Sequence, residues 1–537
     1  MLSGLGLVLA AVALIVAAQV LSKKTTIPSA ALLTLAGLGV SATPLPDIVL
    51  DPDVVLTLVI PPLLYSAALN SSLVAIRKNA LTILSLSVGL VIATASVVGV
   101  GLYLLIPTVT LAAGMALGAA VAPPDPVAAL AVGRRAGIPP RLVTLIEGEG
   151  LLNDATALTM LTVATTAIAL HDMSPPEAGG LFLLAAGGGV AVGVAIAFVI
   201  RLVQRVIDDP LLLNIVSLVT PFIAYLAAEH VHASGVLAVV VTALIVGHDT
   251  RHAASSASRL QTGAVWRLID VLLEGFVFLL IGEQLPTVVA GLSAYSLPTV
   301  ATAVGVTLAG VLLLRPVWLY VTERLPRRKN REGADIPRLS GREIVVMSWA
   351  GTRGVITVAA AFSLPLTLDN GDPFVARDLL LFCAFVVVLV TVVGQGTTFA
   401  PLVRRLNVRA DAATTSRVRN EARQGAAKAA LAQLDRIAKD EKLKPEATTA
   451  FREELEHRIE RYRRRLDHLD NADETSLVSP AQQASLGTRR KLIATQRDEL
   501  LRWRDAGRLP DEDMRVLEHE LDHEEHAMHL PGSGPAS

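Results

Sequence analysis

GAAVAPPDPVAAL, residues 118–130, is an apolar stretch suited to a membrane interior, but three prolines interrupt it around a single charge. A proline inside a helix removes a backbone donor and breaks the helix. Non-helical backbone at membrane depth persists only inside protein or beside a water-filled cavity. The interrupting residues are Pro123, Pro124 and Pro126, with Asp125 among them. We therefore expect a span that is unwound near its middle around a buried carboxylate.

A second stretch of this kind, SWAGTRGVITVAA at residues 348–360, places Gly351 and Gly354 on either side of Arg353. In our count of spans, given below, the two stretches fall in the fifth and the twelfth, at matching positions in two halves of the chain. Paired interruptions of this kind indicate a secondary transporter built from inverted repeats, with its binding site near the middle of the membrane. The predicted fold is an all-α polytopic membrane protein in which two broken helices cross.

Apolar segments long enough to cross a bilayer, which takes roughly 20 residues, occur about thirteen times. Their bounds are 3–21, 27–44, 53–70, 79–106, 111–133, 143–170, 179–202, 211–229, 233–248, 264–290, 297–321, 343–366 and 378–403. The second and ninth are short, and each segment has a buried or re-entrant helix as its alternative. Basic residues follow the first segment and do not precede it, which predicts a retained span and not a signal peptide.

The loops between these segments alternate in charge. Loops after odd-numbered spans contain Lys or Arg, from Lys23 and Lys24 to the basic loop at residues 322–342. Loops after even-numbered spans contain neither, apart from Arg377 at the edge of the last one. Because cytoplasmic loops collect basic residues, we expect a protein of the cell membrane with its N-terminus outside and its C-terminus in the cytoplasm.

The character of the chain changes near residue 404. The whole sequence is 52% hydrophobic and 18% charged, whereas soluble domains are about a quarter charged. Amphipathic, highly charged patterns after residue 404 predict three or four helices. We divide the chain into a transmembrane domain at residues 1–404 and a helical cytosolic regulatory tail at residues 405–537. The net charge of −1 gives no basic excess for nucleic acid, and one cysteine, Cys383, excludes an intrachain disulfide.

Charged side chains inside spans cost about 2.5–3.5 kcal/mol each on insertion scales, so they are usually paired or functional. The candidates at this depth are Asp125, Glu147, Glu149, Asp154, Glu274, Glu283, Arg315 and Arg353. An ionised Glu149 needs a cationic partner, and Arg353 is our candidate for it. Glu274 and Glu283 lie in the tenth span and could line a funnel on either side of the membrane.

The sixth span reads IEGEGLLNDATALTML at residues 146–161. Glu149 and Asn153 are four residues apart and share a helix face, and Asp154 is turned about 100° from Asn153. Desolvation disfavours the charged form of an acid, so a buried carboxylate can exchange a proton for a cation near neutral pH. Oxygen ligands suit hard cations. Only Asp154 of the Asn–Asp pair titrates, which predicts one proton exchanged per monovalent cation. The alternative for both residues is a purely structural role, as hydrogen-bonding groups inside a helix bundle.

The charges of the two broken spans have a structural interpretation as well. The Asp125 carboxylate can neutralise the positive N-terminal end of a half-helix, and Arg353 can neutralise carbonyl ends. We prefer this interpretation to direct cation binding for both residues. Asp125 nevertheless stays with Asp154 and Asn153 among the candidate cation- and proton-binding residues.

Three motifs together resemble the sodium/proton antiporters of the monovalent cation/proton antiporter family. GEGLLNDATAL at 148–158 is similar to the signature of their sixth span, VAPPDPVA at 121–128 to their unwound fifth span, and AGTRGVITVAAAFSLP at 350–365 to their arginine-bearing twelfth. PPLLYSAAL at 61–69 and EGFVFLLIGEQL at 274–285 also resemble family segments. The similarity runs in order through residues 1–404.

This resemblance implies a homodimer in the lipid bilayer. Spans 1–3 and 8–10 would form its dimerisation domain, and spans 4–6 and 11–13 a mobile core that carries the ion. It implies that Asp154 carries the monovalent cation or the proton, and that Glu149 pairs with Arg353. No cofactor is implied, because the partners are the transported ions.

Two positions depart from the commoner family pattern. Pro124 stands where many members have Thr, and Gly150 stands where many have Ser. Both hydroxyls are possible cation ligands, so backbone carbonyls, water or other side chains must complete the shell here. The departures bear on which ion binds, and not on antiport itself.

We therefore predict proton-coupled sodium antiport by alternating access, electroneutral at one to one. Potassium and lithium are alternative ions under the same mechanism. A cation channel or a membrane sensor is the alternative from another class, although continuous conduction needs no titrating carboxylate. The sequence contains no HExxH, P-loop or nucleophile motif that would favour a membrane enzyme.

Overall fold

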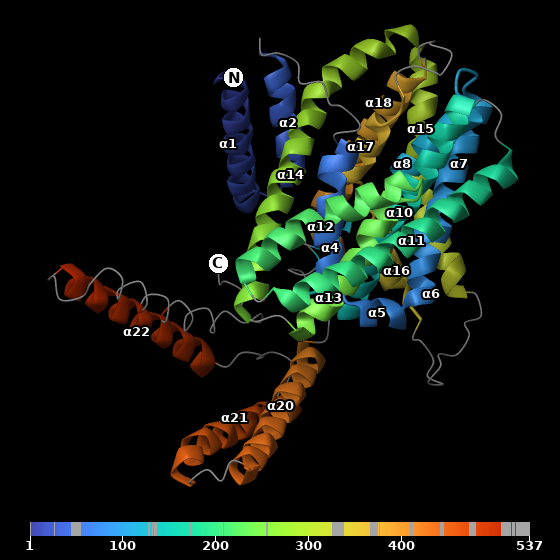
Figure 1. Cartoon of the computed structure of the whole chain (residues 1–537). Helices are drawn as coiled ribbons and strands as arrows, with labels where there is room; N and C mark the ends of the chain where they lie inside the picture. Colours follow the sequence, from blue (N-terminus) through green and yellow to red (C-terminus); the bar gives the residue numbers. More distant parts are fainter. Residues whose placement is uncertain are drawn as a thin grey trace. The chain divides into compact units, whose positions relative to one another are not determined.

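The computed structural model gives the conformation of most of the chain (Figure 1). The residues that it describes are 2–25, 27–43, 55–126, 129, 130, 133, 137–170, 174–207, 209–253, 256–324, 338–365, 374, 376–408, 412–440, 445–471, 480–505, 517 and 521. The chain divides into two compact units, Met1–Arg409 and Ala410–Ser537. The predicted boundary between residues 404 and 405 lies close to this division.

In the described part of the first unit, all regular secondary structure is helical, without a β-strand. Its elements are α1 (Leu2–Lys24), α2 (Ser29–Ser41), η1 (Val55–Val59), α4 (Ile60–Asn70), α5 (Leu73–Lys78), α6 (Ala80–Leu84), η2 (Ser85–Gly89), α7 (Leu90–Leu105), α8 (Leu111–Val121), α10 (Pro140–Leu170), α11 (Pro175–Val206), α12 (Pro210–His230), α13 (Gly235–Ala253), α14 (Ser256–Gly291), η3 (Leu292–Ala294), α15 (Leu297–Arg324), α16 (Gly341–Trp349), α17 (Val355–Phe362), α18 (Arg377–Leu389), η4 (Val390–Gln395) and α19 (Gly396–Leu406). The predicted all-α membrane fold is confirmed.

Every segment predicted to span the membrane coincides with a helix or a run of helices. Within the described residues, 7 helices are long and apolar enough to cross a membrane. Shorter apolar helices occupy Ser29–Ser41, Leu56–Leu69, Leu111–Val121 and Gly235–His248. The count of thirteen crossings stays a prediction. The structure adds details that the sequence did not indicate: the short helix α5, and π-helical turns (η1, η2 and η4) within the third, fourth and thirteenth segments.

Both broken spans begin with a capped helix end. The Thr110 hydroxyl accepts a hydrogen bond from the Ala113 amide at 3.2 Å before α8. Ser340 and Glu343 form a reciprocal capping box before α16, with the Ser340 amide donating to the Glu343 carboxylate at 2.7 Å. Such caps satisfy amides that have no partner inside the helix. Local sequence therefore fixes where each half-helix starts, and the breaks fix where it ends.

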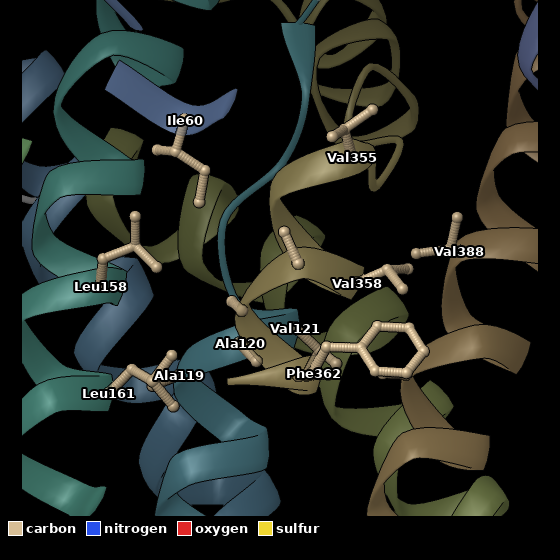
Figure 2. Close-up of a cluster of buried hydrophobic side chains, with 14 of the residues drawn as sticks. Ile60, Ala119, Ala120, Val121, Leu158, Leu161, Val355, Val358, Phe362 and Val388 are labelled. Carbon is tan, nitrogen blue, oxygen red and sulfur yellow. The ribbon is translucent and has the colours of Figure 1, made fainter. Parts of the chain in front are cut away.

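An apolar shell surrounds the broken segments. Figure 2 shows side chains from α4, α8, α10, α17 and α18 converging on one buried cluster, and α17 packs against both α8 and α18. The labelled members are Ile60, Ala119, Ala120, Val121, Leu158, Leu161, Val355, Val358, Phe362 and Val388. Any polar group inside this shell must find its partner within the protein, because unpaired polar groups are costly to bury.

The described residues of the second unit form three helices, α20 (Ala412–Asp440), α21 (Pro445–Asn471) and α22 (Pro480–Asp505). Helices α20 and α21 pack against each other, and Arg452 of α21 forms an ion pair with Asp435 of α20 at 2.5 Å. The predicted number of tail helices, three or four, stays a prediction. The segment expected to form a fourth, at about 511–530, falls almost wholly outside the described residues.

Helices α2 and α14 approach so closely that two glycines are required at their contact. A Cβ on Gly37 would overlap the carbonyl oxygen of Leu279, and one on Gly282 would overlap that of Thr34. Backbone atoms cannot yield as a flexible side chain can. This contact between α2 and α14 therefore depends on residues without side chains, as helix contacts in membranes often do.

We expect Gly37→Val to destabilise the protein by about 1–3 kcal/mol or more, the range for overpacking a well-packed site. Gly39→Val on the same helix is the matched control, because nothing lies within 4 Å of a Cβ at that position. Thermal unfolding in detergent should show a lower Tm for Gly37→Val alone. Equal Tm values for the two variants would contradict the observed packing.

Candidate ion-binding site

The unwound segments of the two broken spans are bonded to each other. Helix α8 ends at Val121, and helical conformation resumes at Pro126. Helix α16 ends at Trp349, and α17 begins at Val355. The prolines and glycines noted in the sequence thus lie in or beside the breaks: Pro123, Pro124, Pro126, Gly351 and Gly354.

Backbone and hydroxyl hydrogen bonds join the two breaks directly. The Asp125 amide donates to the Thr352 carbonyl at 2.6 Å, and the Thr352 hydroxyl donates to the Asp125 carbonyl at 2.8 Å. These groups would otherwise be unpaired at membrane depth, where water cannot replace a missing partner. Each broken helix therefore supplies hydrogen-bond partners that the other lacks.

Within the described residues, the Arg353 guanidinium binds carbonyl oxygens and no carboxylate. Its Nε donates to the Val121 carbonyl at 2.9 Å and one Nη donates to the Ala122 carbonyl at 3.1 Å. The other Nη donates to the Gly351 carbonyl. The side chain is only 2% exposed. A cation at the C-terminal ends of α8 and α16 offsets the negative ends of their dipoles.

Asp125 lies against the start of α17. A Cβ on Gly354, the residue that precedes this helix, would overlap the Asp125 carboxylate. Gly354 therefore allows the carboxylate to approach the N-terminal end of α17, where a negative charge is favourable. The two charges of the broken spans thus sit at opposite kinds of helix end, each with the sign that the dipole favours.

The predicted ion pair between Glu149 and Arg353 is wrong, because Glu149 pairs with Arg315. Both guanidinium Nη atoms of Arg315 donate to the two Glu149 oxygens, one of them at 2.9 Å. Arg315 Nε also donates to the Met347 carbonyl at 3.0 Å, near the end of α16. The two side chains are 1% and 3% exposed. The Arg353 guanidinium already donates its hydrogen bonds to backbone carbonyls. Arg315, which lies on α15, presents its planar guanidinium to the Glu149 carboxylate.

Asn153 and Asp154 differ in their surroundings, although they are adjacent on α10. Asn153 is fully buried, and its amide nitrogen donates to the Pro124 carbonyl at 2.8 Å. Its amide oxygen accepts from the Asp154 backbone amide. Asp154 is 7% exposed, and its carboxylate has no ion-pair partner in the part of the chain that the structure describes.

Packing accounts for one of the two departures from the family pattern. A Cβ on Gly150 would overlap the ring of Pro126. A serine at this position would displace the chain that follows Asp125. The missing hydroxyl is therefore a consequence of how closely α10 approaches the broken span.

These features define a class of protein: a polytopic helical membrane protein whose two broken helices cross beside a buried acid. The described residues hold no group of three or more His, Cys, Asp or Glu side chains placed to bind a metal ion. The crossing of two broken helices is the arrangement expected of a secondary transporter.

The chain belongs to the sodium/hydrogen exchanger family, whose transmembrane sequence model matches residues 8–405. A Na(+)/H(+) exchanger of Mycobacterium tuberculosis (strain H37Rv) is 33% identical over 97% of this chain and 96% of its own. A sodium, potassium, lithium and rubidium/H(+) antiporter of Bacillus pumilus is 34% identical over 66% of this chain and 55% of its own. The chain is thus a cation/proton antiporter, and the prediction of a transporter is confirmed.

A solved structure has the same fold. The sodium proton antiporter MjNhaP1 from Methanocaldococcus jannaschii at pH 8 superposes with a TM-score of 0.59. The superposition covers 75% of this chain and 98% of that one, at 19% sequence identity. The likeness supports the fold predicted from the two broken spans.

We expect Glu149→Ala and Arg315→Ala each to destabilise the protein by about 3–5 kcal/mol, because each strands a buried charge. The double variant should lose less than the sum of the two, as contacting residues do. Glu149→Ala combined with Arg353→Ala should be closer to additive. Unfolding curves in detergent measure all three, with Glu149→Gln and Arg315→Lys as milder replacements where an alanine variant does not fold. Additive losses for Glu149 and Arg315 would contradict the observed pair.

Proposed function

We propose that this protein exchanges sodium for protons across the cell membrane, with Asp154 binding either the cation or a proton. The observation that carries the proposal is the charge arrangement around Asp154. Arg315 is committed to Glu149, and Arg353 to backbone carbonyls. Asp154 is left as a buried acid without a fixed cation among the described residues, so a mobile cation or proton must balance its charge.

The breaks supply the remaining ligands in this proposal. Hard cations take oxygen ligands, and unwound backbone beside Asp154 offers carbonyl oxygens together with the Asp125 carboxylate. Asn153 contributes mainly by position, because its amide nitrogen holds the Pro124 carbonyl. A proton on Asp154 removes the charge that attracts the cation. Binding of the two ions is therefore mutually exclusive, which couples their opposite movements.

We extend the proposal to the moving parts on the basis of the family resemblance. Spans 4–6 and 11–13 carry the site and move against spans 1–3 and 8–10, which hold two copies together as a homodimer. The site then opens to one side of the membrane at a time. The alternation of loop charge supports an N-terminus outside and a cytoplasmic tail.

Potassium is the second candidate ion. Pro124 and Gly150 leave two positions near the site without hydroxyl ligands. The relative in Bacillus pumilus is named for sodium, potassium, lithium and rubidium. Reconstituted protein with a proton-sensitive dye, given sodium, potassium or lithium in turn, decides between them. A larger proton flux with potassium than with sodium would overturn the sodium assignment and leave the mechanism intact.

Asp154→Asn should abolish exchange while leaving the protein folded, because Asn cannot alternate between two charge states. The measurement is cation-driven proton flux in proteoliposomes, with a Tm in detergent as the folding control. Its matched control is Asp378→Asn, which removes a carboxylate in the first turn of α18. Near-normal flux in the Asp154→Asn variant would show that another residue exchanges the proton for the cation.

Exchange should be electroneutral, because one titrating carboxylate binds either one proton or one monovalent cation, so one positive charge moves in each direction. An imposed membrane potential should then leave the rate nearly unchanged. One net charge moving through the full potential would involve about 2.3 kcal/mol per 100 mV. Rates measured under a valinomycin clamp at several potentials test this, and a steep dependence would require a second transported proton.

A further inference from the structure

The π-helical turn η4, which follows α18 in the thirteenth predicted span, contacts the break between α16 and α17. Thr391, the second residue of this turn, is fully buried. Its hydroxyl accepts a hydrogen bond from the Arg353 amide at 3.0 Å and donates one to the Val387 carbonyl at 2.8 Å. Figure 2 shows Val388, three residues before Thr391, beside Val358 of α17. Single π-helical turns inside α-helices often occur at functional sites.

Helix α17 has no side-chain cap of its own. Its N-cap residue is Gly354, and no side chain bonds the first amides of the helix from that position. A Cβ on Gly354 would overlap the Asp125 carboxylate, so the serine or threonine that commonly caps a helix does not fit there. The Arg353 amide, one residue earlier, instead finds its partner on another span, in the Thr391 hydroxyl.

One peptide group connects Thr391 to the fifth span. The Thr352 carbonyl and the Arg353 amide belong to the same planar group. The carbonyl accepts from the Asp125 amide at 2.6 Å, while the amide donates to Thr391. Hydrogen bonds in such a chain polarise and strengthen one another. The Thr391 hydroxyl therefore fixes the orientation of the peptide to which the Asp125 backbone is bonded.

The unwound segment around Asp125 is thus held from two directions. On one side, the Asn153 amide nitrogen of α10 donates to the Pro124 carbonyl at 2.8 Å. On the other side, the Thr352–Arg353 peptide bonds the Asp125 amide, and Thr391 bonds that peptide. The position of the carbonyl oxygens in this segment depends on both attachments. These oxygens are ligands of the cation in our proposed function.

We propose that Thr391 is a positioning residue for the ion site. Its hydroxyl fixes the Thr352–Arg353 peptide, and through it the unwound segment that offers oxygen ligands to a cation at Asp154. Thr391 itself binds neither ion. Sites of this kind depend on surrounding hydrogen bonds that hold their ligands to within about 0.5 Å. The inference rests on the proposed function of Asp154 and makes sodium affinity depend on a residue of the thirteenth span.

The test is the sodium dependence of exchange by the full-length protein in proteoliposomes. Thr391→Val replaces the hydroxyl with a methyl group and leaves the Arg353 amide without its partner. The half-saturating sodium concentration should rise about three- to tenfold, which corresponds to the net contribution of one hydrogen bond. The maximal rate should stay within about twofold, because no group that binds an ion is removed. Thr391→Ser keeps the hydroxyl and should restore the original half-saturation.

Thr94→Val is the matched control. Thr94 is 2% exposed, and its hydroxyl donates to the Leu90 carbonyl of its own helix at 2.7 Å. Its replacement therefore removes the same intrahelical bond that Thr391 makes to Val387, and no bond to a broken span. Half-saturation should stay unchanged in this variant. A Tm in detergent for each variant separates stability from affinity, and Thr391→Ala removes the same hydroxyl where the valine variant does not fold.

Hydrogen exchange measured by mass spectrometry tests the contact itself. A peptide that covers residues 351–355 should exchange faster in Thr391→Val than in the unmodified protein. The same peptide should be unchanged in Thr94→Val and in Thr391→Ser. Equal protection in Thr391→Val would show that the Thr391 hydroxyl does not hold the Arg353 amide, and would overturn the proposal.

The transport measurement has its own contrary outcomes. Unchanged half-saturation in folded Thr391→Val, or an equal rise in Thr391→Ser or Thr94→Val, would overturn the positioning role. A lower maximal rate at unchanged half-saturation would overturn it too, because positioned ligands act on binding. Failure of the proposed function is distinct, since it shows as exchange that survives Asp154→Asn whatever residue stands at position 391.

Discussion

Two helices that break at membrane depth leave backbone amides and carbonyls without partners, and the crossing of their unwound segments is where these groups are satisfied. Asp125 and Thr352 exchange two hydrogen bonds across the crossing. The Arg353 guanidinium donates hydrogen bonds to carbonyls at the ends of α8 and α16. Neither break could persist alone against lipid, since hydrocarbon offers no partner for an unpaired backbone group. The crossing also provides the Pro124 carbonyl that Asn153 binds.

Some of the buried charges hold the structure together, whereas Asp154 is exchangeable in our proposal. Glu149 and Arg315 neutralise each other and tie α10 to α15, while the Arg315 Nε also binds the end of α16. Pairing of this kind is costly to break, because removal of one partner leaves an unbalanced charge. Asp154 lies five residues after Glu149 on the same helix, outside that pair. The same helix thus carries a fixed acid and, in our proposal, a mobile one.

Close backbone approach determines which side chains can stand near the site. Gly150 lies against the Pro126 ring, and Gly354 lies against the Asp125 carboxylate. A side chain at either position would push the broken span away from α10 or α17. The missing hydroxyl at residue 150 is therefore a packing requirement.

The sequence by itself determined the helical membrane class, both breaks and the family, because long apolar runs, internal prolines and paired glycines act locally. It also identified Asp154 and the other buried charges, since a charge inside an apolar run is visible without any structure. The tertiary structure determined which of these charged side chains pair with each other. Glu149 could have met either arginine, and only the tertiary fold brings the Arg315 fork on α15 to it, while backbone carbonyls bind Arg353. The role of Asn153 was decided in the same way, because its partner, the Pro124 carbonyl, becomes available only where a helix distant in sequence unwinds beside it.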